Sequence, residues 1–319
     1  MKTLLFALLF IAGNTFAQQK SRLVVAKDGS GDFTSIQEAV SSVRDFSYFA
    51  VTIFIKKGVY REKLLIPSWK TGITLSGEDK DSTVIVNGDH TGKILLNNNK
   101  VNTFTSYTLQ VAGNDNIIEN LTIENNAPLG AGQAVALHVE GDRCIIRNCK
   151  LLGNQDTLYA AGGASRQYYT DCYIEGTTDF IFGAATAIFN NCIINSKTNS
   201  FITAASTTRH QEYGYVLINC KLIASEGVNK VYLGRPWRPY AATIFINCEL
   251  GKHITPEGWN IWDKKETDGT MRYAEYKNTG PGAATNARAG WTRQLTDKEA
   301  KSITVTKVFE GWDPLKQQY

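Results

Sequence analysis

Hydrophobic and polar positions in the middle of the chain repeat in one short frame. Two apolar residues, a variable residue, Asn or Asp, Cys, a variable residue and then Ile or Leu recur, and the last five positions read RNCKL, TDCYI, NNCII, INCKL and INCEL. An earlier copy, IIENLTI, has Leu121 at the cysteine position. The Asn or Asp positions are spaced by 28, 23, 20, 28 and 28 residues, a range typical of solenoid repeats; they are Asn120, Asn148, Asp171, Asn191, Asn219 and Asn247.

Each copy has the pattern of a short β-strand with an inward Cys, Leu or Ile, and it shows no helical period. We therefore predict an all-β, single-domain, right-handed parallel β-helix in which each repeat is one coil. The first coils are expected at 51–66 (VTIFIKKGVYREKLLI) and 72–77 (GITLSG).

Short helices are predicted near both ends of the chain, where two pairs of residues have the spacing of a capping box. Ser35 and Glu38 form the first pair, and Thr296 and Glu299 form the second. A helix after Ser35 is expected to close the open end of the solenoid. The segment NTGPGAATNARAG, at 278–290, is expected to be a loop.

The cysteines of the repeat are interpreted as a packed internal ladder of small core residues. A metal site is the weaker interpretation, because metal-binding cysteines usually come in C-x-x-C pairs and the chain has none. One disulfide stays open as an alternative. Cys172 and Cys192 are the candidate pair because the shortest coil separates them.

The N-terminal residues have the composition of an export signal. Lys2 is followed by an apolar run over 4–12 and by small residues Thr15 and Ala17, which predicts a signal peptide over 1–17 and one domain over 18–319. The run is too short to cross a bilayer, and no second membrane segment is evident, so we expect a secreted or periplasmic protein. The formal charge of +4 is too small and too evenly spread to indicate nucleic acid binding, but it suits an acidic substrate.

Two aspartates share one column of the predicted solenoid. Asp156 follows Asn148 by eight residues, and Asp179 follows Asp171 by eight. Adjacent parallel strands lie about 4.8 Å apart, so the two carboxyl groups should be direct neighbours. Neighbouring carboxyl groups cannot both ionise easily, which prepares one as an acid and the other as a nucleophile or base. The alternative is a structural role in turns, where Asp often bonds to backbone. In the next two coils the same count gives Asn199 and Gly227, neither of which ionises.

Further polar residues favour the catalytic interpretation. Gln155 precedes Asp156, and Gln133 stands one coil earlier, so their amide N–H groups are candidates to hold an oxyanion. Arg235 stands before Pro236, which favours an extended backbone and a guanidinium directed at a carboxylate.

Aromatic residues flank these positions and are candidates for stacking on sugar rings. They are Tyr159, Phe182, Trp237 and Tyr240, with Trp259 and Trp262 further on, whereas Phe180 and Trp312 are expected in the core. The four histidines lack metal-ligand spacing, and no G-x-S-x-G motif is present, so carboxylates are the candidates for catalysis.

Five ordered motifs make the chain resemble the pectin methylesterases, carbohydrate esterases that demethylate homogalacturonan. The motifs are GVYREK at 58–63, QAVALHV from Gln133, GNQDTLY ending at Tyr159, DFIFG from Asp179 and LGRPW from Leu233. The resemblance covers nearly all of 18–319 and implies a right-handed parallel β-helix, methyl-esterified pectin as substrate, no cofactor and no metal. A monomer is also expected. His138 departs from the arginine that plant members commonly carry there, which leaves subsite preference open.

The resemblance also implies a role for each matched residue. Asp179 would attack the ester carbonyl, while Asp156 would act first as general acid and then as general base. Gln133 and Gln155 would hold the oxyanion, and Arg235 would orient Asp179. Tyr159, Phe182 and Trp237 would line the substrate groove.

Three alternatives remain at this stage. A family member could act on another ester or a thioester with the same residues. A pectate lyase or polygalacturonase would share the β-helix but would need a calcium-binding acidic cluster or a different carboxylate set, neither of which the sequence shows. A non-catalytic carbohydrate-binding solenoid is disfavoured, because both aspartates, both glutamines and Arg235 are retained.

Overall fold

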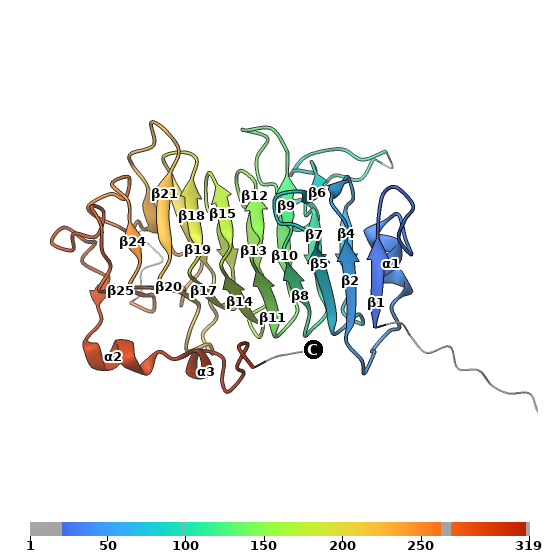
Figure 1. The fold of residues 1–319 in the computed structure, drawn as a ribbon. Coiled ribbons are helices and arrows are strands. Elements are labelled where there is room, and N and C mark those ends of the chain that lie inside the picture. The colour runs from blue at the N-terminus through green and yellow to red at the C-terminus, as the bar shows by residue number, and fades with distance from the viewer. Residues whose placement is uncertain (1–20, 97, 263–268, 317–319) are drawn as a thin grey trace, which may run out of the picture.

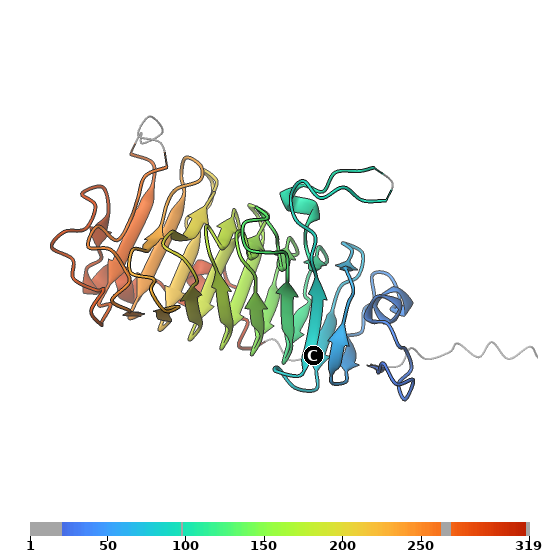
Figure 2. The same cartoon turned by 90° about the horizontal axis from the view of Figure 1, so that it is seen from above.

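The chain winds into a parallel β-helix, as the repeat predicts (Figures 1 and 2). The computed structural model describes residues 21–96, 98–262 and 269–316, so the predicted signal peptide lies outside the described residues. Every strand pairing between named strands is parallel, and the strands form three sheets that run side by side along the solenoid.

The strands are divided among the three sheets as follows. Sheet A holds β1 (Arg22–Val25), β2 (Val51–Ile55), β5 (Ile73–Gly77), β8 (Ile117–Glu119), β11 (Cys144–Arg147), β14 (Arg166–Thr170), β17 (Thr186–Asn190), β20 (Tyr215–Ile218), β23 (Ala242–Ile246), β25 (Arg272–Tyr276) and β26 (Arg293–Gln294). Sheet B holds β3 (Gly58–Tyr60), β6 (Thr83–Asn87), β9 (Thr122–Asn125), β12 (Lys150–Leu152), β15 (Tyr173–Gly176), β18 (Ile193–Ser196), β21 (Lys221–Ala224) and β24 (Glu249–Leu250). Sheet C holds β4 (Leu64–Ile66), β7 (Leu109–Val111), β10 (Leu137–Val139), β13 (Leu158–Ala160), β16 (Ile181–Gly183), β19 (Phe201–Ala205) and β22 (Tyr232–Gly234).

The Asn/Asp positions of the repeat form the corner between sheets A and B. All six have a left-handed backbone, with φ between 49° and 57°, a conformation that Asn and Asp tolerate better than other side chains. Two pairs also bond between coils: Asn148 Nδ2 donates to Asn120 Oδ1 at 2.7 Å, and Asn191 Nδ2 donates to Asp171 Oδ1 at 2.6 Å. The repeat is therefore a corner signature, and the strand pairings confirm its spacings.

One hydrophobic core fills the interior from the first coil to the last. Alternate residues of each strand point inward, for example Ile53, Leu75, Ile118 and Ile146 from successive strands of sheet A, all fully buried. Phe180 belongs to this core, as expected. Trp259, in contrast, is not a surface aromatic: it is 2% exposed and packs against Phe245 and Tyr273 inside the last coils.

The cysteines form the expected internal ladder, and the proposed Cys172–Cys192 disulfide is wrong. All six cysteines are free and buried. The five repeat thiols each lie near the carbonyl oxygen of a residue about one coil earlier; Cys172 Sγ, for example, lies 3.5 Å from the Ile146 oxygen. Each thiol is thus directed at the neighbouring backbone, which satisfies its weak donor without a covalent bond.

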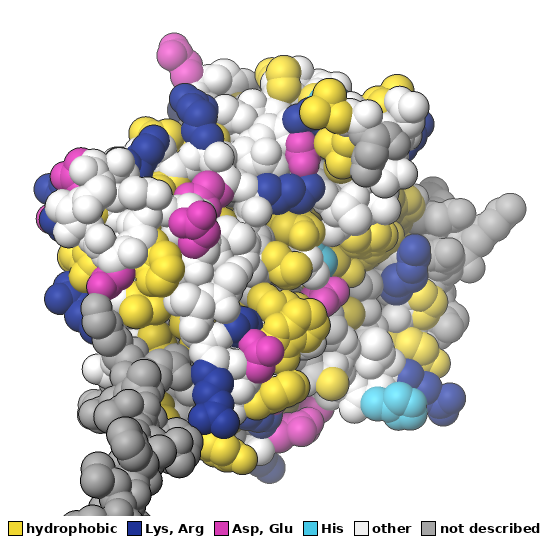
Figure 3. Space-filling view, turned by 90° about the vertical axis from the view of Figure 1, so that its right-hand side faces the viewer, with side chains coloured by type: hydrophobic (Ala, Val, Ile, Leu, Met, Phe, Trp, Pro, Cys, Tyr) yellow, Lys and Arg dark blue, Asp and Glu magenta, His cyan; other side chains and the backbone are white. Residues whose placement is uncertain are grey.

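A short helix covers the N-terminal end of the core. Helix α1 (Ile36–Ser42) buries Ile36, Ala39 and Val40 against the first coil (Figure 1). Ser35 caps it by accepting the N–H of Glu38, but the carboxylate at this helix start comes from Glu62 of the GVYREK segment. Glu62 accepts from the Ser35 hydroxyl and from the N–H groups of Ile36 and Gln37. Seen from this end, acidic and basic side chains lie interspersed among hydrophobic ones (Figure 3).

The C-terminal segment turns back along sheet A and ends in two further helices. Helix α2 (Asp297–Ser302) has the predicted capping box between Thr296 and Glu299, and helix α3 (Val305–Val308) follows it. The 278–290 segment is irregular, as expected, but its Arg288 enters the protein and bonds Glu275, whose side chain is only 2% exposed. Of the helices described, none is long and apolar enough to cross a membrane.

The thiol ladder predicts that alkylation of the unreduced, unfolded protein adds six labels. Burial raises the pKa of the Cys144 thiol to about 12, and buried thiols react slowly, so the folded protein should take up few labels under the same conditions. Intact-mass measurement before and after unfolding checks both expectations. Four labels on the unreduced, unfolded chain would show a disulfide and contradict the ladder.

Candidate active site

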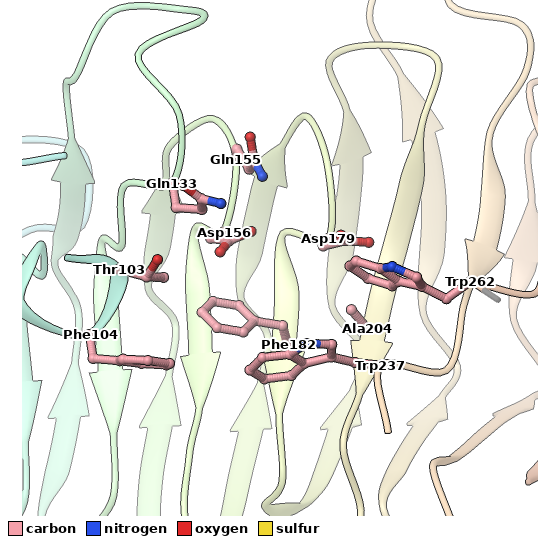
Figure 4. A pocket seen from close by; sticks show the side chains of 10 residues that line it. All are labelled: Thr103, Phe104, Gln133, Gln155, Asp156, Asp179, Phe182, Ala204, Trp237 and Trp262. Carbon is pink, nitrogen blue, oxygen red and sulfur yellow. The ribbon is translucent and has the colours of Figure 1, made fainter. Parts of the chain in front are cut away.

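A pocket opens where sheet B turns into sheet C, over the middle coils. Ten residues line it, and six of them are predicted site residues or substrate contacts (Figure 4). The lining consists of Thr103, Phe104, Gln133, Gln155, Asp156, Asp179, Phe182, Ala204, Trp237 and Trp262.

Asp156 and Asp179 lie in adjacent coils, as the repeat predicts. Strands β13 and β16 pair Leu158 with Ile181, and continuing this register back by two residues places Asp156 opposite Asp179. Both aspartates have a left-handed backbone, with φ of 64° and 49°. They are 8% and 5% exposed, so both carboxyl groups are held side by side at the edge of the core.

The predicted column is wrong beyond Asp179. Strands β16 and β19 pair Ile181 with Thr203, so Phe201, not Asn199, lies opposite Asp179, and the next pair is Phe201 with Tyr232, not Gly227. The register pairs Gly176 with Ser196 and Ile181 with Thr203, so six residues, 197–202, stand between matched positions where the coil before has four, 177–180. Counting from the Asn/Asp corner missed this difference. Asp179 is therefore flanked by an aromatic ring on one side and by Asp156 on the other.

Arg235 bonds one carboxyl group of the pair. Its Nε donates to Asp179 Oδ1 at 3.0 Å and its Nη2 to Asp179 Oδ2 at 2.6 Å, a geometry that uses both carboxylate oxygens. No side-chain hydrogen bond from a described residue reaches Asp156. The two stacked carboxyl groups therefore have unequal surroundings.

Burial and charge separate the two carboxyl groups electrostatically. Burial raises the pKa of Asp156 to about 8, with a smaller contribution from the negative charge of Asp179. Burial also raises the pKa of Asp179, but there the two hydrogen bonds and the positive charge of Arg235 act in the opposite direction. Because the two groups are coupled, the pair shares its titration: the first proton leaves mainly from Asp179 and the second mainly from Asp156.

Gln133 and Gln155 lie in adjacent coils beside the carboxyl pair. Their backbones form a parallel bridge, and the N–H of Ala134 donates to the Gln155 carbonyl at 3.0 Å. Both amide side chains line the pocket above Asp156 (Figure 4). The pocket thus combines the amide groups of Gln133 and Gln155 with two carboxyl groups. Arg235 bonds that of Asp179 but not that of Asp156.

An aromatic row forms the floor of the pocket on sheet C. Tyr159 and Phe182 are paired in adjacent strands and stack with their ring centroids 4.6 Å apart, and Trp237 meets Phe182 edge-on at 5.9 Å. Of the four predicted substrate contacts, Phe182 and Trp237 are among the lining residues described, whereas Tyr159 and Tyr240 are not. Tyr159 contacts the lining through its stack on Phe182. Tyr240 lies in the turn before β23, where its backbone bonds Thr270 and Arg272.

His138 lies opposite Tyr159 in the preceding strand, β10, and extends the aromatic row by one coil. The two rings are 4.6 Å apart, and His138 is 2% exposed. Its Nε2 lies 3.2 Å from Glu140 Oε1, while its buried Nδ1 has no hydrogen-bond partner among the described residues. Burial lowers the pKa of His138, against the effect of Glu140, so this side chain supports the floor as a neutral ring.

Sequence reasoning missed Thr103, Phe104 and Ala204, and it mentioned Trp262 only as a more distant aromatic. Thr103 and Phe104 belong to the short 3₁₀ helix η1 (Thr103–Thr105) in the long connection between β6 and β7, which lies outside the repeat frame. Lys63 holds this helix by donating to the Thr105 carbonyl and to Asp89, each at 2.6 Å. In the sequence, Lys63 of the GVYREK motif was the signal that could have indicated that this connection lies beside the pocket.

The histidine, cysteine and acidic side chains within the described ranges form no group of three that could hold a metal ion. The pocket offers carboxyl and amide groups, and a guanidinium bonds one of the carboxyl groups. Such a set can attack an acyl carbon, hold the resulting oxyanion and move one proton.

Comparisons with known proteins identify the family of this chain. A family model described as Pectinesterase matches residues 22–312. Pectinesterase 31 of Arabidopsis thaliana is 39% identical over 281 residues, which cover 86% of this chain and 88% of that protein. The solved structure of pectin methylesterase from carrot is 33% identical and covers 91% of this chain and 93% of its own, with a TM-score of 0.84. A pectin methylesterase in complex with hexasaccharide VII is 32% identical and covers 92% and 98%, with a TM-score of 0.81.

Three findings support the same assignment: the family model spans the described β-helix, one relative has a similar length, and the solved structures have the same fold. The chain belongs to the pectinesterase family and is a carboxylic ester hydrolase, a pectin methylesterase.

Proposed function

We propose that this enzyme hydrolyses the C6 methyl esters of homogalacturonan by way of an aspartate nucleophile, releasing methanol and leaving pectate. The observation that carries the proposal is the unequal pair of stacked carboxyl groups, of which Arg235 bonds Asp179 and not Asp156. The similar enzyme solved with a hexasaccharide supports a sugar polymer as the substrate.

In the first half of the reaction, an oxygen of ionised Asp179 attacks the ester carbonyl carbon and forms a tetrahedral intermediate. The amide groups of Gln133 and Gln155, which line the pocket, donate hydrogen bonds to the oxyanion. As the intermediate collapses, the C–O bond to the methoxy group breaks and protonated Asp156 gives its proton to the leaving oxygen. Methanol departs, and an anhydride between Asp179 and the sugar C6 remains.

In the second half, Asp156 is ionised and takes a proton from water as the water oxygen attacks the anhydride. The new tetrahedral intermediate breaks its bond to Asp179, which returns to its ionised form beside Arg235. The sugar leaves with a free carboxyl group at C6, and Asp156 is protonated again. A pKa of about 8 suits this exchange, because Asp156 then holds its proton at neutral pH and releases it at small cost.

The aromatic residues are proposed to bind the sugar chain. Phe182 and Trp237 line the pocket and Tyr159 supports Phe182 by stacking, so apolar faces of sugar rings can lie against them. Tyr240 is left out of this role because it lies away from the lining residues. Since residues 1–17 have the pattern of an export signal and pectin is an extracellular polymer, we also propose that the enzyme acts outside the cytoplasm.

The decisive test is methanol release from highly methyl-esterified pectin, with Asp179→Asn as the comparison. The variant should lose turnover while it keeps its fold, because an amide cannot replace the attacking carboxylate. Asp171→Asn is a matched control, since Asp171 has the same left-handed backbone but lies at the opposite corner. Substantial turnover by folded Asp179→Asn would remove Asp179 as the nucleophile.

Replacing Gln155 by Ala should lower kcat by ~10²–10³, the usual effect of removing one oxyanion donor, and should change KM much less. Steady-state kinetics of methanol release measure both constants. Gln110→Ala serves as control, because Gln110 lies in β7 of sheet C and is not among the described lining residues of the pocket. A Gln155→Ala enzyme with the wild-type rate would leave the oxyanion role without support.

The pH profile of kcat/KM should be bell-shaped, with its alkaline side near pH 8. Asp156 must be protonated to release methanol, so activity falls as the pH rises through the pKa of about 8. The acid side reports protonation of Asp179. An alkaline side that begins well above pH 8 would contradict the assignment of Asp156 as the acid.

The same pKa predicts a pH-dependent gain in stability for Asp156→Asn. The folded protein favours protonated Asp156, so wild-type stability falls as the pH rises from the ordinary pKa of 3.8 to about 8. An amide does not titrate and escapes this loss. The Tm of Asp156→Asn minus that of the wild type should therefore increase between pH 5 and pH 8 and then level off. A difference that stays constant over this range would show that burial does not raise the pKa of Asp156.

A further inference from the structure

Phe201 occupies the column position directly after Asp179. The N–H of Asp179 donates to the Phe201 carbonyl at 2.8 Å, so the two residues are joined through the backbone ladder. The Phe201 ring stacks on Tyr232 in the next coil, with centroids 5.3 Å apart and an interplanar angle of 21°. Phe201 is partly buried and is not among the described residues that line the pocket.

The guanidinium of Arg235 lies between two aromatic rings. Its Cζ is 4.0 Å from the centroid of the Phe201 ring and 3.5 Å from the centroid of the Trp262 ring. Two rings so close to one carbon atom would overlap on a single side, so they cover different faces of the planar group. The guanidinium edge is left to bond Asp179, which it does through Nε and Nη2.

A guanidinium with an aromatic ring on each face can rotate only within its own plane. This restriction favours the two parallel hydrogen bonds from Arg235 to Asp179, which need one orientation of the group. An arginine side chain has several rotatable bonds, and its fork matches a carboxylate only when the two groups are nearly coplanar. Aromatic faces attract the cation and exclude other orientations of the guanidinium. Trp262 also lines the pocket, whereas Phe201 contacts Arg235 and is not among the lining residues described. The two rings are therefore separable by mutation.

We propose that Phe201, supported by Tyr232, is a positioning residue that fixes the Arg235 guanidinium in the orientation that bonds both oxygens of Asp179. The kinetic part of this inference rests on the proposed function; the structural part does not. Among the described residues, Phe201 is outside the pocket lining, and its ring is placed to act through Arg235.

The charged and titratable groups around Asp179 determine which way the pH profile should shift when Arg235 is held less firmly. Asp156 faces it from the turn before β13, Arg235 from the segment after β22, and the phenol of Tyr273 in β25 lies within electrostatic reach. Burial raises the pKa of Tyr273 far above neutrality, so it carries no charge. Arg235 lowers the pKa of both aspartates, and a loosely held guanidinium would lower them less.

The test compares Phe201→Leu, which removes the aromatic face, with Phe201→Tyr, which keeps it. Phe201→Leu should reduce kcat for methanol release at neutral pH about tenfold or more, with KM changed by less than about twofold, because misorientation acts on the reacting groups. Both sides of its pH profile should move to higher pH. Phe201→Tyr should stay near the wild type in all three measurements.

Phe189→Leu is the matched control, because Phe189 also stacks on one tyrosine, Tyr169, and meets Tyr215 edge-on. In the described part of the chain, the arginines that lie over aromatic rings lie over other rings. It should lower Tm without moving either side of the pH profile. An unchanged kcat and pH profile in folded Phe201→Leu would overturn the inference. A shift of both sides to lower pH would overturn it too, because that shift would mean that water had entered and relieved burial.

A second measurement is independent of activity. The Nε–H of Arg235, bonded to Asp179, should give a slowly exchanging proton–nitrogen signal, which Arg235→Lys would identify by its disappearance. Phe201→Leu should speed this exchange at least about tenfold, and Phe201→Tyr should not; equal exchange in all three proteins would overturn the inference. If the wild type released no methanol from pectin while the exchange result held, the proposed function would fail and the positioning role would stand.

Discussion

The parallel backbone ladder is the constraint on which the rest of this structure depends. Neighbouring coils bond through their backbones at a spacing of about 4.8 Å, so each residue's neighbour is set by register and not by side-chain preference. Coils of 20, 23 and 28 residues keep that register because extra residues are placed in turns. The ladder therefore brings Asp156 beside Asp179, Gln133 beside Gln155, and Tyr159 beside Phe182. These three pairs come from three adjacent coils at one sheet corner, and residues of further coils and of the β6–β7 connection complete the pocket.

Burying a carboxyl group costs free energy unless other groups bond it. Glu275 and Asp156 are both buried, but they differ in how their oxygens are bonded. Glu275 is satisfied on both oxygens: Trp259 and Arg288 donate to Oε1, while Asn278 and Arg288 donate to Oε2. Such a pair is a structural anchor for the C-terminal segment. Asp156 is almost as buried, yet no side chain in the described ranges bonds its carboxyl group. This carboxyl group lines the pocket, and burial raises its pKa, which makes it a candidate functional group.

The sequence predicted the parts of the site that follow the repeat and missed those that depend on turn length. The Asn/Asp corner located both aspartates, because strands on either side of them keep the same count. The count failed at Phe201, where two additional turn residues shift the column. It gave nothing for Phe104, since the connection that carries it has no repeat. Trp259 and Trp262 differ by three positions and look alike in sequence, yet one is buried in the core and the other lines the pocket.

The backbone conformation of the two aspartates connects the fold with the chemistry. At the corner between sheets A and B, every repeat needs a residue that tolerates a left-handed backbone, and Asn or Asp fills that position. Asp156 and Asp179 have the same conformation at the opposite corner, where the chain turns from sheet B into sheet C. A turn that already favours Asn or Asp can thus place a carboxyl group at the core edge without additional backbone strain. In the proposed mechanism, the step from a structural corner to a catalytic one requires little more than two acidic side chains in successive coils and one arginine that bonds one of them.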